Sequence, residues 1–99
     1  MDLDFRTGQA EKLWTDKGFT AGFARPVIKA YRKAIQYIRN AKDERDLRAM
    51  RSFNYKKMKG NRSHQHCMRL NDQYRLILEV EEANKGKKIW IVGVEDYHR

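Results

Sequence analysis

The first half of the chain shows short apolar patterns separated by one long loop. Leu3 and Phe5 alternate with charged residues, and this period of two predicts a short, half-buried strand. Residues 9–15 can form one or two helical turns, and the glycines in 17–26 predict a loop. Pro26 favours the start of a helix, because its fixed φ and missing amide suit the first helical turn.

The helix that starts at Pro26 has the clearest periodicity in the sequence. Its apolar residues recur at spacings of three and four, which places them in one stripe along a helix. They are Val27, Ile28, Tyr31, Ile35 and Ile38, with basic and amide residues between them. Asp43 is positioned to cap a second, short helix that ends near Met50.

From residue 53 onward the period changes to two, which predicts strands. A three-residue loop at 71–73 pairs Leu70 with Tyr74 and Arg69 with Arg75. His66 is expected to face the core. The predicted strands cover residues 66–71, 74–81 and 89–94, with a second turn at 82–88.

A strand, helices and an antiparallel meander together predict a small α+β domain. The antiparallel β-sheet would have the N-terminal helices packed on one face, and residues 1–99 would form a single domain. The composition, 40% hydrophobic and 11% aromatic, is that of a folded chain. No apolar run approaches the roughly 20 residues of a membrane span. The start MDLDFR does not resemble a signal peptide, and Cys67 is the single cysteine, so a reducing cytoplasm is expected.

The net charge of +9 is unevenly distributed. Residues 51–75 hold seven Lys/Arg against one Asp/Glu, residues 1–50 hold eleven against seven, and residues 76–99 hold four against five. Concentrated positive charge favours a polyanion, because each neutralised phosphate releases counterions. A solvated basic face or an acidic protein partner fits the same charge.

Two groups of cations are candidates for binding phosphate. Arg69 and Arg75 would repel each other across the hairpin unless an anion lies between them, and a guanidinium matches phosphate geometry. A carboxylate such as Glu79 or Asp96 is the alternative partner. The second group surrounds the segment YKKMKGNR, which lacks the spacing of a phosphate-binding P-loop. The candidate RNA-binding residues are Arg51, Lys56, Lys57 and Arg62.

The remaining polar motifs are HQHC at residues 64–67 and EDYH at residues 95–98. The first lacks the second Cys/His pair that structural zinc usually requires, so we expect no metal and no cofactor. In the second, His98 can transfer protons near neutral pH, Asp96 can orient it, and Tyr97 can stack on a base. The structural alternative is that Tyr97 plugs the core.

Three motifs, in this order, resemble the HigB branch of the RelE/ParE toxin superfamily. Members typically show a Leu-Lys-Gly-like turn, an Arg-x-Asn hairpin followed by Trp/Tyr-Arg, and a terminal Asp-Tyr-His. The corresponding residues here are Met58-Lys59-Gly60, Arg69-Leu70-Asn71 with Tyr74-Arg75, and Asp96-Tyr97-His98. The resemblance covers residues 43–98 closely and the helical half more loosely.

The resemblance implies a RelE-like fold and a bacterial type II toxin. Such a toxin cleaves mRNA in the decoding site of the 70S ribosome without metal, by attack of a ribose 2′-OH on the adjacent phosphate. It also implies a cognate helix-turn-helix antitoxin, with operator DNA contacted only through that antitoxin, and no membrane. The implied catalytic residues are Lys59, Arg69, Arg75, Asp96, Tyr97 and His98.

One position departs from the family pattern. Lys56 stands where many relatives have a histidine. The version of the family mechanism that uses two imidazoles therefore lacks one of them here, and His64 and His66 are the candidate substitutes. Two alternatives to the ribonuclease stay open. One is a ParE-like inhibitor that binds DNA gyrase, and the other is an RNA-binding relative without catalytic activity.

Overall fold

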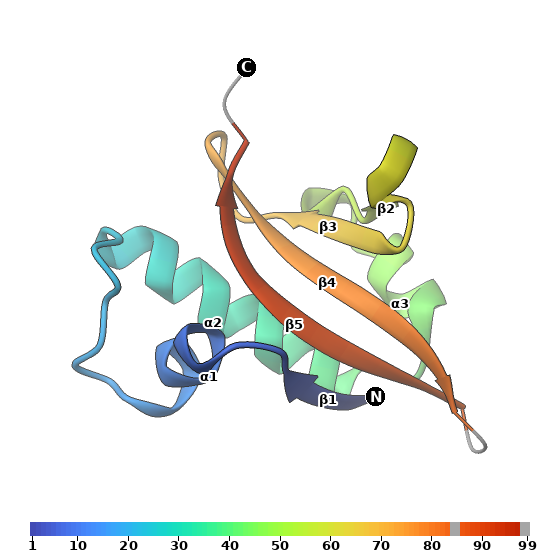
Figure 1. Cartoon of the computed structure of the whole chain (residues 1–99), viewed down its shortest axis with the longest axis horizontal. Coiled ribbons are helices and arrows are strands. Elements are labelled where there is room, and N and C mark those ends of the chain that lie inside the picture. The colour runs from blue at the N-terminus through green and yellow to red at the C-terminus, as the bar shows by residue number, and fades with distance from the viewer. Residues whose placement is uncertain (84–85, 98–99) are drawn as a thin grey trace.

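The computed structural model describes residues 1–83 and 86–97. One strand, then the helices, then the remaining strands follow each other in the predicted order, and the long curved strands of the C-terminal half dominate the molecule (Figure 1). The elements are β1 (Asp2–Phe5), α1 (Gly8–Thr15), α2 (Arg25–Asn40), α3 (Glu44–Ala49), the 3-10 turn η1 (Arg51–Phe53), β2 (Lys56–Lys57), the 3-10 turn η2 (Gly60–Arg62), β3 (Gln65–Arg69), β4 (Tyr74–Ala83) and β5 (Gly86–Asp96). Within the described residues, no helix is both long enough and apolar enough to span a membrane.

The five strands form one sheet in the order β1-β5-β4-β3-β2. β2 to β5 pair antiparallel, but β1 lies parallel to β5, with Leu3 opposite Ile89. The predicted α+β class is therefore confirmed, and the sheet is mixed instead of purely antiparallel. No hairpin joins β1 to β5, so the connection does not impose an antiparallel orientation.

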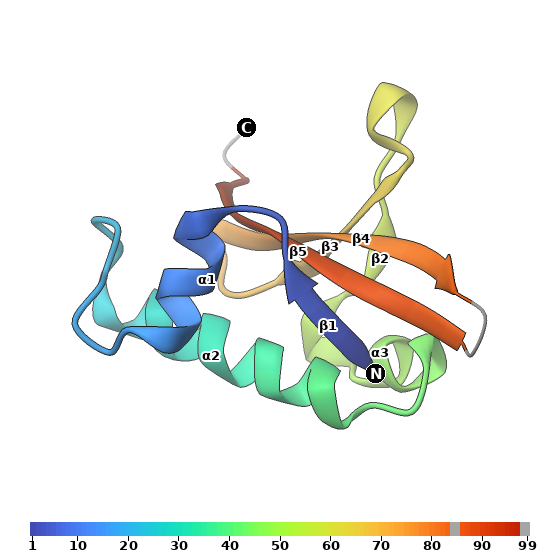
Figure 2. The same ribbon diagram turned by 60° about the horizontal axis from the view of Figure 1, so that its bottom comes forward.

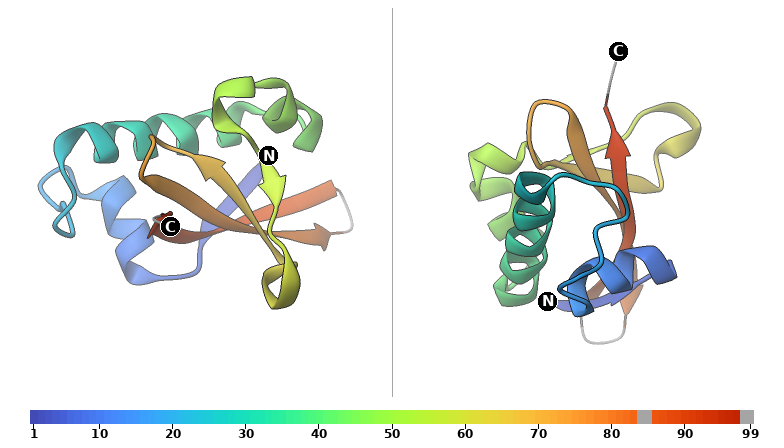
Figure 3. Two further views of the ribbon diagram at one scale, coloured as in Figure 1. Left: turned by 90° about the horizontal axis from the view of Figure 1, so that it is seen from above. Right: turned by 90° about the vertical axis from the view of Figure 1, so that its left-hand side faces the viewer.

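α2 and α3 cover one face of the sheet, and the β2–η2 hairpin lies on the opposite side (Figures 2 and 3). The predicted stripe of α2 is the side that the sheet buries, and Tyr31, Ile35 and Ile38 have no exposed surface. The Tyr31 hydroxyl donates to the carbonyl of Ala10 at 2.7 Å, which joins α2 to α1. The strand residues beneath the helices are Met68, Leu76, Leu78, Ile89 and Ile91.

The turn between β3 and β4 has the predicted register, with Arg69 opposite Arg75. The Asn71 side-chain oxygen accepts the backbone N–H groups of Gln73 at 2.9 Å and Tyr74 at 2.7 Å, which closes the turn. Further along, the register between β4 and β5 shifts by one residue next to Ile77. Such a bulge bends the strand and changes the direction of neighbouring side chains.

A buried carboxylate anchors α3 to the sheet. Glu44 is 7% exposed and accepts hydrogen bonds from the Tyr55 hydroxyl at 2.8 Å and from the Lys87 ammonium, while Arg48 lies 3.6 Å away. His66 stacks on Tyr55 with ring centroids 5.1 Å apart. Burial acts to raise the pKa of Glu44, but its hydrogen bonds outweigh burial and the net pKa is lowered. His66 thus faces the helix side of the sheet, as predicted.

Truncating the buried stripe of α2 should destabilise the fold. Ile35→Ala removes a fully buried side chain, and we expect a loss of about 2–5 kcal/mol in the free energy of unfolding. The measurement is urea unfolding followed by circular dichroism. Gln36→Ala, on the exposed side of the same helix, is the control and should change stability little. Equal losses in the two variants would contradict the assigned core.

Stability should also depend on the ionisation of Glu44. A carboxyl group whose pKa is lower in the folded state stabilises fully above its ordinary value of 4.5, and that contribution is lost as pH falls through the folded value. Glu44→Gln should therefore lower the free energy of unfolding by about 1–3 kcal/mol at neutral pH. Below pH 4.5 the free energy of unfolding should fall less steeply in the variant than in the wild type. Urea unfolding across pH 2–7 would measure both, with Glu11→Gln on the surface as control. If the variant lost stability below pH 4.5 as steeply as the wild type, an ionised Glu44 would not be what stabilises the fold.

Candidate functional site

The sheet face opposite α2 carries most of the predicted site. The β2–η2 hairpin and the end of β5 both extend on this side (Figure 2). The backbone N–H of Tyr97 donates to the carbonyl of Gln73 at 2.6 Å, which fixes the end of β5 to the β3–β4 turn. Residues far apart in the sequence are thereby brought together around Tyr97.

Two cations lie over the Tyr97 ring. The Arg75 guanidinium carbon is 4.4 Å from the ring centroid, and the Lys56 ammonium is 5.7 Å from it. Both distances are within the range of a cation–π interaction. Tyr97 is therefore a half-buried aromatic platform with positive charge around it, and it lies on the same side of the sheet as Cys67, away from α2 and α3.

Beside Tyr97 lies a cavity of about 330 Å³. Its lining residues are Lys56, Lys57, Met58, Lys59, Cys67 and Tyr97. Among the described residues, no carboxylate pairs with any of the three lysines, so their charge is available to an anion. Cys67 is buried, and burial raises the pKa of its thiol, which keeps it protonated and a poor nucleophile.

Arg75 is held in place by backbone carbonyls. Its NH1 group donates to the carbonyl of Asn71 at 2.8 Å and to that of Tyr74 at 3.2 Å. Its Nε is buried without a hydrogen-bond partner in the described part of the chain. Neutral carbonyls orient the guanidinium and leave its full positive charge in place, as an electrostatic site for an anion requires.

Arg62, predicted to bind RNA, is already bound to a carboxylate. Its NH1 and NH2 groups donate to the two oxygens of Glu95 at 2.7 and 2.8 Å, and its Nε donates to Gln65 at 3.1 Å. This pair ties the η2 hairpin to β5, and the Arg62 guanidinium holds the pKa of Glu95 below its usual range. Sequence reasoning missed Glu95, although its position two residues before Tyr97 places both on one strand face.

Three other predicted residues lie away from the Tyr97 cavity. Arg69 is opposite Arg75 in the register, but its guanidinium is bonded to Asp72 and its side chain lines a cavity beneath α2. The two arginines therefore do not form the expected clamp. Asp96 pairs with Tyr74 and accepts from the Gln73 side chain at 3.1 Å. Arg51 is exposed in η1, beside α3, and His98 lies outside the described residues.

The histidines of the HQHC motif diverge. His66 stacks on Tyr55 on the helix side, whereas the exposed His64 is 3.9 Å from Glu79. Neither lines the cavity beside Tyr97. In the part of the chain that the structure describes, no three His, Cys, Asp or Glu residues are grouped as metal ligands would be.

No protein-family model and no curated protein matches this chain. Among solved structures, a YoeB/ParE toxin from Agrobacterium tumefaciens is similar, with a TM-score of 0.61 and 10% sequence identity. The match covers 99% of this chain and 100% of that one. The similarity is one of fold. It confirms the predicted α+β fold, in which helices pack on one face of a small sheet.

Releasing Arg62 from its carboxylate should strengthen RNA binding. In Glu95→Gln the arginine keeps its charge and loses its anionic partner, so affinity for single-stranded RNA should rise. The slope of log K against log salt should steepen by roughly 0.7, because one more cation contacts phosphate. Fluorescence polarisation of a short labelled RNA over a salt series measures both quantities. Glu11→Gln, exposed on α1 and without an ion pair in the described part of the chain, makes the same charge change. An equal gain in both variants would show that net charge alone acts.

Proposed function

We propose that this chain is the toxin of a type II toxin–antitoxin system and cleaves mRNA on the ribosome. The observation that carries the proposal is the cluster of Lys56, Lys59 and Tyr97 around one cavity, with the Arg75 guanidinium over the Tyr97 ring. The fold shared with a YoeB/ParE toxin supports the toxin class. The HigB-like motifs support the ribonuclease branch within it.

The arrangement suits transfer of a phosphoryl group within RNA. In the proposed reaction the ribose 2′-oxygen bonds to the adjacent phosphorus, the bond from phosphorus to the 5′-oxygen breaks, and a cyclic phosphate and a 5′-OH result. Negative charge grows on the phosphate oxygens in the transition state. Arg75, Lys56 and Lys59 would stabilise it, and a well-placed donor of this kind is worth on the order of 3 kcal/mol.

Tyr97 would position the nucleotide at the cut. Its ring can stack on a base, and its hydroxyl can donate to a phosphate oxygen. Because His64 and His66 lie away from the cavity, His98 is the imidazole that we propose for proton transfer, with Asp96 as its orienting partner. The 2′-OH proton leaves as the new bond forms, and the departing 5′-oxygen takes up a proton.

The proposed partners follow from this activity. The ribosome would present the mRNA, and the exposed Lys57 and Arg51 would contact RNA backbone. A helix-turn-helix antitoxin would neutralise the toxin and connect it to operator DNA. The bacterial cytoplasm, where ribosomes and mRNA meet, is the proposed location.

The deciding experiment is cleavage of a defined mRNA by the purified chain. We expect new 5′-OH ends that require programmed ribosomes and persist in EDTA, since the proposed chemistry uses no metal. Intact mRNA despite ribosome binding would instead indicate a protein that only binds. Intact mRNA without ribosome binding would lead to an assay of DNA gyrase, the target of the ParE alternative.

Two variants test the terminal motif. His98→Ala should slow ribosome-dependent cleavage by about 10²-fold or more, because it removes a general acid–base group. Tyr97→Phe should also slow cleavage, while ribosome affinity changes little in both. Tyr74→Phe and His64→Ala make the same chemical changes away from the cavity and should cut at the wild-type rate. Wild-type cleavage by His98→Ala and Tyr97→Phe would remove these residues from the proposed mechanism.

A further inference from the structure

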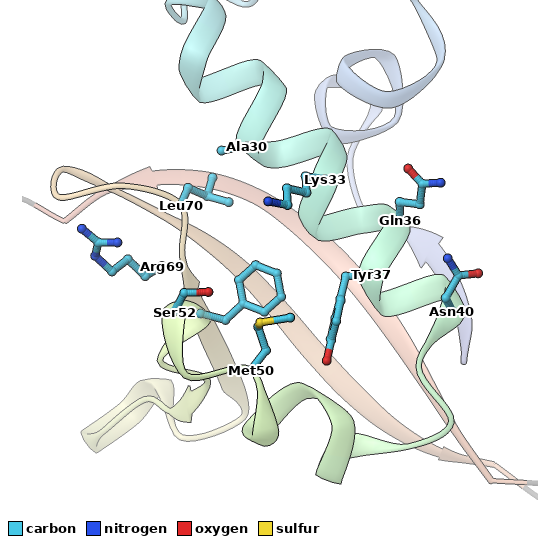
Figure 4. A pocket seen from close by; sticks show the side chains of 10 residues that line it. Ala30, Lys33, Gln36, Tyr37, Asn40, Met50, Ser52, Arg69 and Leu70 are labelled. Atoms are coloured by element: carbon cyan, nitrogen blue, oxygen red, sulfur yellow. The ribbon is translucent and has the colours of Figure 1, made fainter.

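A second cavity in the described part of the chain lies on the other side of the sheet. Its volume is about 410 Å³, within the range of sites that hold ligands. α2, the segment after α3 and the end of β3 enclose it (Figure 4). The lining residues are Ala30, Lys33, Gln36, Tyr37, Asn40, Met50, Ser52, Phe53, Arg69 and Leu70.

The floor of this cavity is apolar and fixed in shape. Tyr37 and Phe53 meet edge to face with ring centroids 5.1 Å apart, and the Tyr37 hydroxyl donates to the carbonyl of Asp46 at 2.9 Å. Met50 is 38% exposed, more than any other large apolar residue in the described part of the chain. An apolar side chain from a partner would therefore enter a formed hollow, without prior rearrangement of the protein.

The rim of the cavity is cationic and polar. Lys33 and Arg69 contribute positive charge, and the Gln36 and Asn40 amides can bond to the backbone of a peptide. α2 has no acidic residue along its whole length. Its basic residues are Arg25, Lys29, Arg32, Lys33 and Arg39.

These features together favour an acidic peptide over RNA as the occupant. RNA-binding surfaces combine cations with aromatic faces on which bases stack, as around Tyr97. Here the Tyr37 ring packs against Phe53, and the hollow beside it is lined by Ala30, Met50 and Leu70. Anchoring of apolar side chains in a groove, with charges at its rim, is a common mode of peptide recognition.

We propose that this cavity binds a segment of a partner protein in which carboxylates flank an apolar anchor side chain. The anchor would occupy the space over Tyr37 and Met50, and the carboxylates would meet Lys33 and Arg69. A role for this cavity in regulating the toxin rests on the proposed toxin function, and the antitoxin is then the natural source of the segment. The site is distinct from the Tyr97 cavity and lies on the helix side of the sheet.

Arg69 connects this cavity to the proposed active site. It stands opposite Arg75 in the hairpin, yet its side chain lines the rim of the cavity beneath α2 and its guanidinium is bonded to Asp72. A partner carboxylate at the rim would add to Asp72 in holding Arg69 there. The partner would thus hold Arg69 on the helix side and prevent it from joining Arg75 at the substrate phosphate, which is the role that the family resemblance implies for it.

The test is a selection of displayed random peptides against the purified chain. Ala30→Trp fills the hollow from α2, and Lys33→Glu reverses the charge at its rim. Lys29→Glu makes the same charge change on α2 outside the lining and is the matched control. Thermal melts verify that each variant is folded, and fluorescence polarisation of a labelled selected peptide gives its affinity.

Selected peptides should carry an apolar residue next to Asp or Glu. Ala30→Trp should weaken their binding by about thirtyfold or more, as for a central anchor, and Lys33→Glu by more than about tenfold. Lys29→Glu should change binding little. No enrichment, enrichment without acidic residues, or equal losses in the two charge reversals would overturn the proposal, as would competition of the peptide by single-stranded RNA.

The regulatory role has its own readout. A selected peptide should inhibit ribosome-dependent cleavage by the wild type and not by Ala30→Trp. Equal inhibition of both would show that the peptide acts outside this cavity and would overturn the regulatory role. If the wild type does not cleave mRNA, the proposed function fails, while the polarisation measurements still decide whether the cavity binds acidic peptides.

Discussion

The register of the β3–β4 hairpin determines where the charged side chains of the C-terminal half lie. Two backbone N–H groups bonded to the Asn71 side chain close the turn and fix that register. Met68 then lies opposite Leu76 on the helix side, and Cys67 opposite Ile77 on the other side. A slip of one residue would exchange the two faces, burying charge beneath α2 and exposing the core. The apolar face and the candidate site are therefore specified together.

The charge of the middle segment is partly neutralised within the chain. Arg62 is bound by Glu95 and Arg69 by Asp72, whereas Lys56, Lys57 and Lys59 pair with no carboxylate among the described residues. The unpaired lysines are those that line the Tyr97 cavity. Fewer cations are thus available to a polyanion than the net charge of residues 51–75 suggests. They are concentrated around one aromatic ring.

The sequence predicted the elements well, because their signals are local. The stripe of α2, the Asp43 cap and the three-residue turn depend on residues a few positions apart, and each was confirmed. The parallel pairing of β1 was missed, since it depends on a strand more than eighty residues away. Side-chain directions at strand ends were also missed. Arg69 and Asp96 are the last residues of β3 and β5, and there a nearby polar partner decides the direction of the side chain.

Arg62 and Glu95 illustrate why a site is harder to predict than a fold. Each is a charged residue on its own segment, and only the closed sheet brings the two within hydrogen-bonding distance. Arg62 is 37% exposed and Glu95 is 43% exposed, so water competes with the pair and its net contribution to stability is small. A phosphate group offers Arg62 the same two-oxygen geometry as the carboxylate. The pair can therefore hold the η2 hairpin in place in the free protein and still open where a phosphate group replaces the carboxylate.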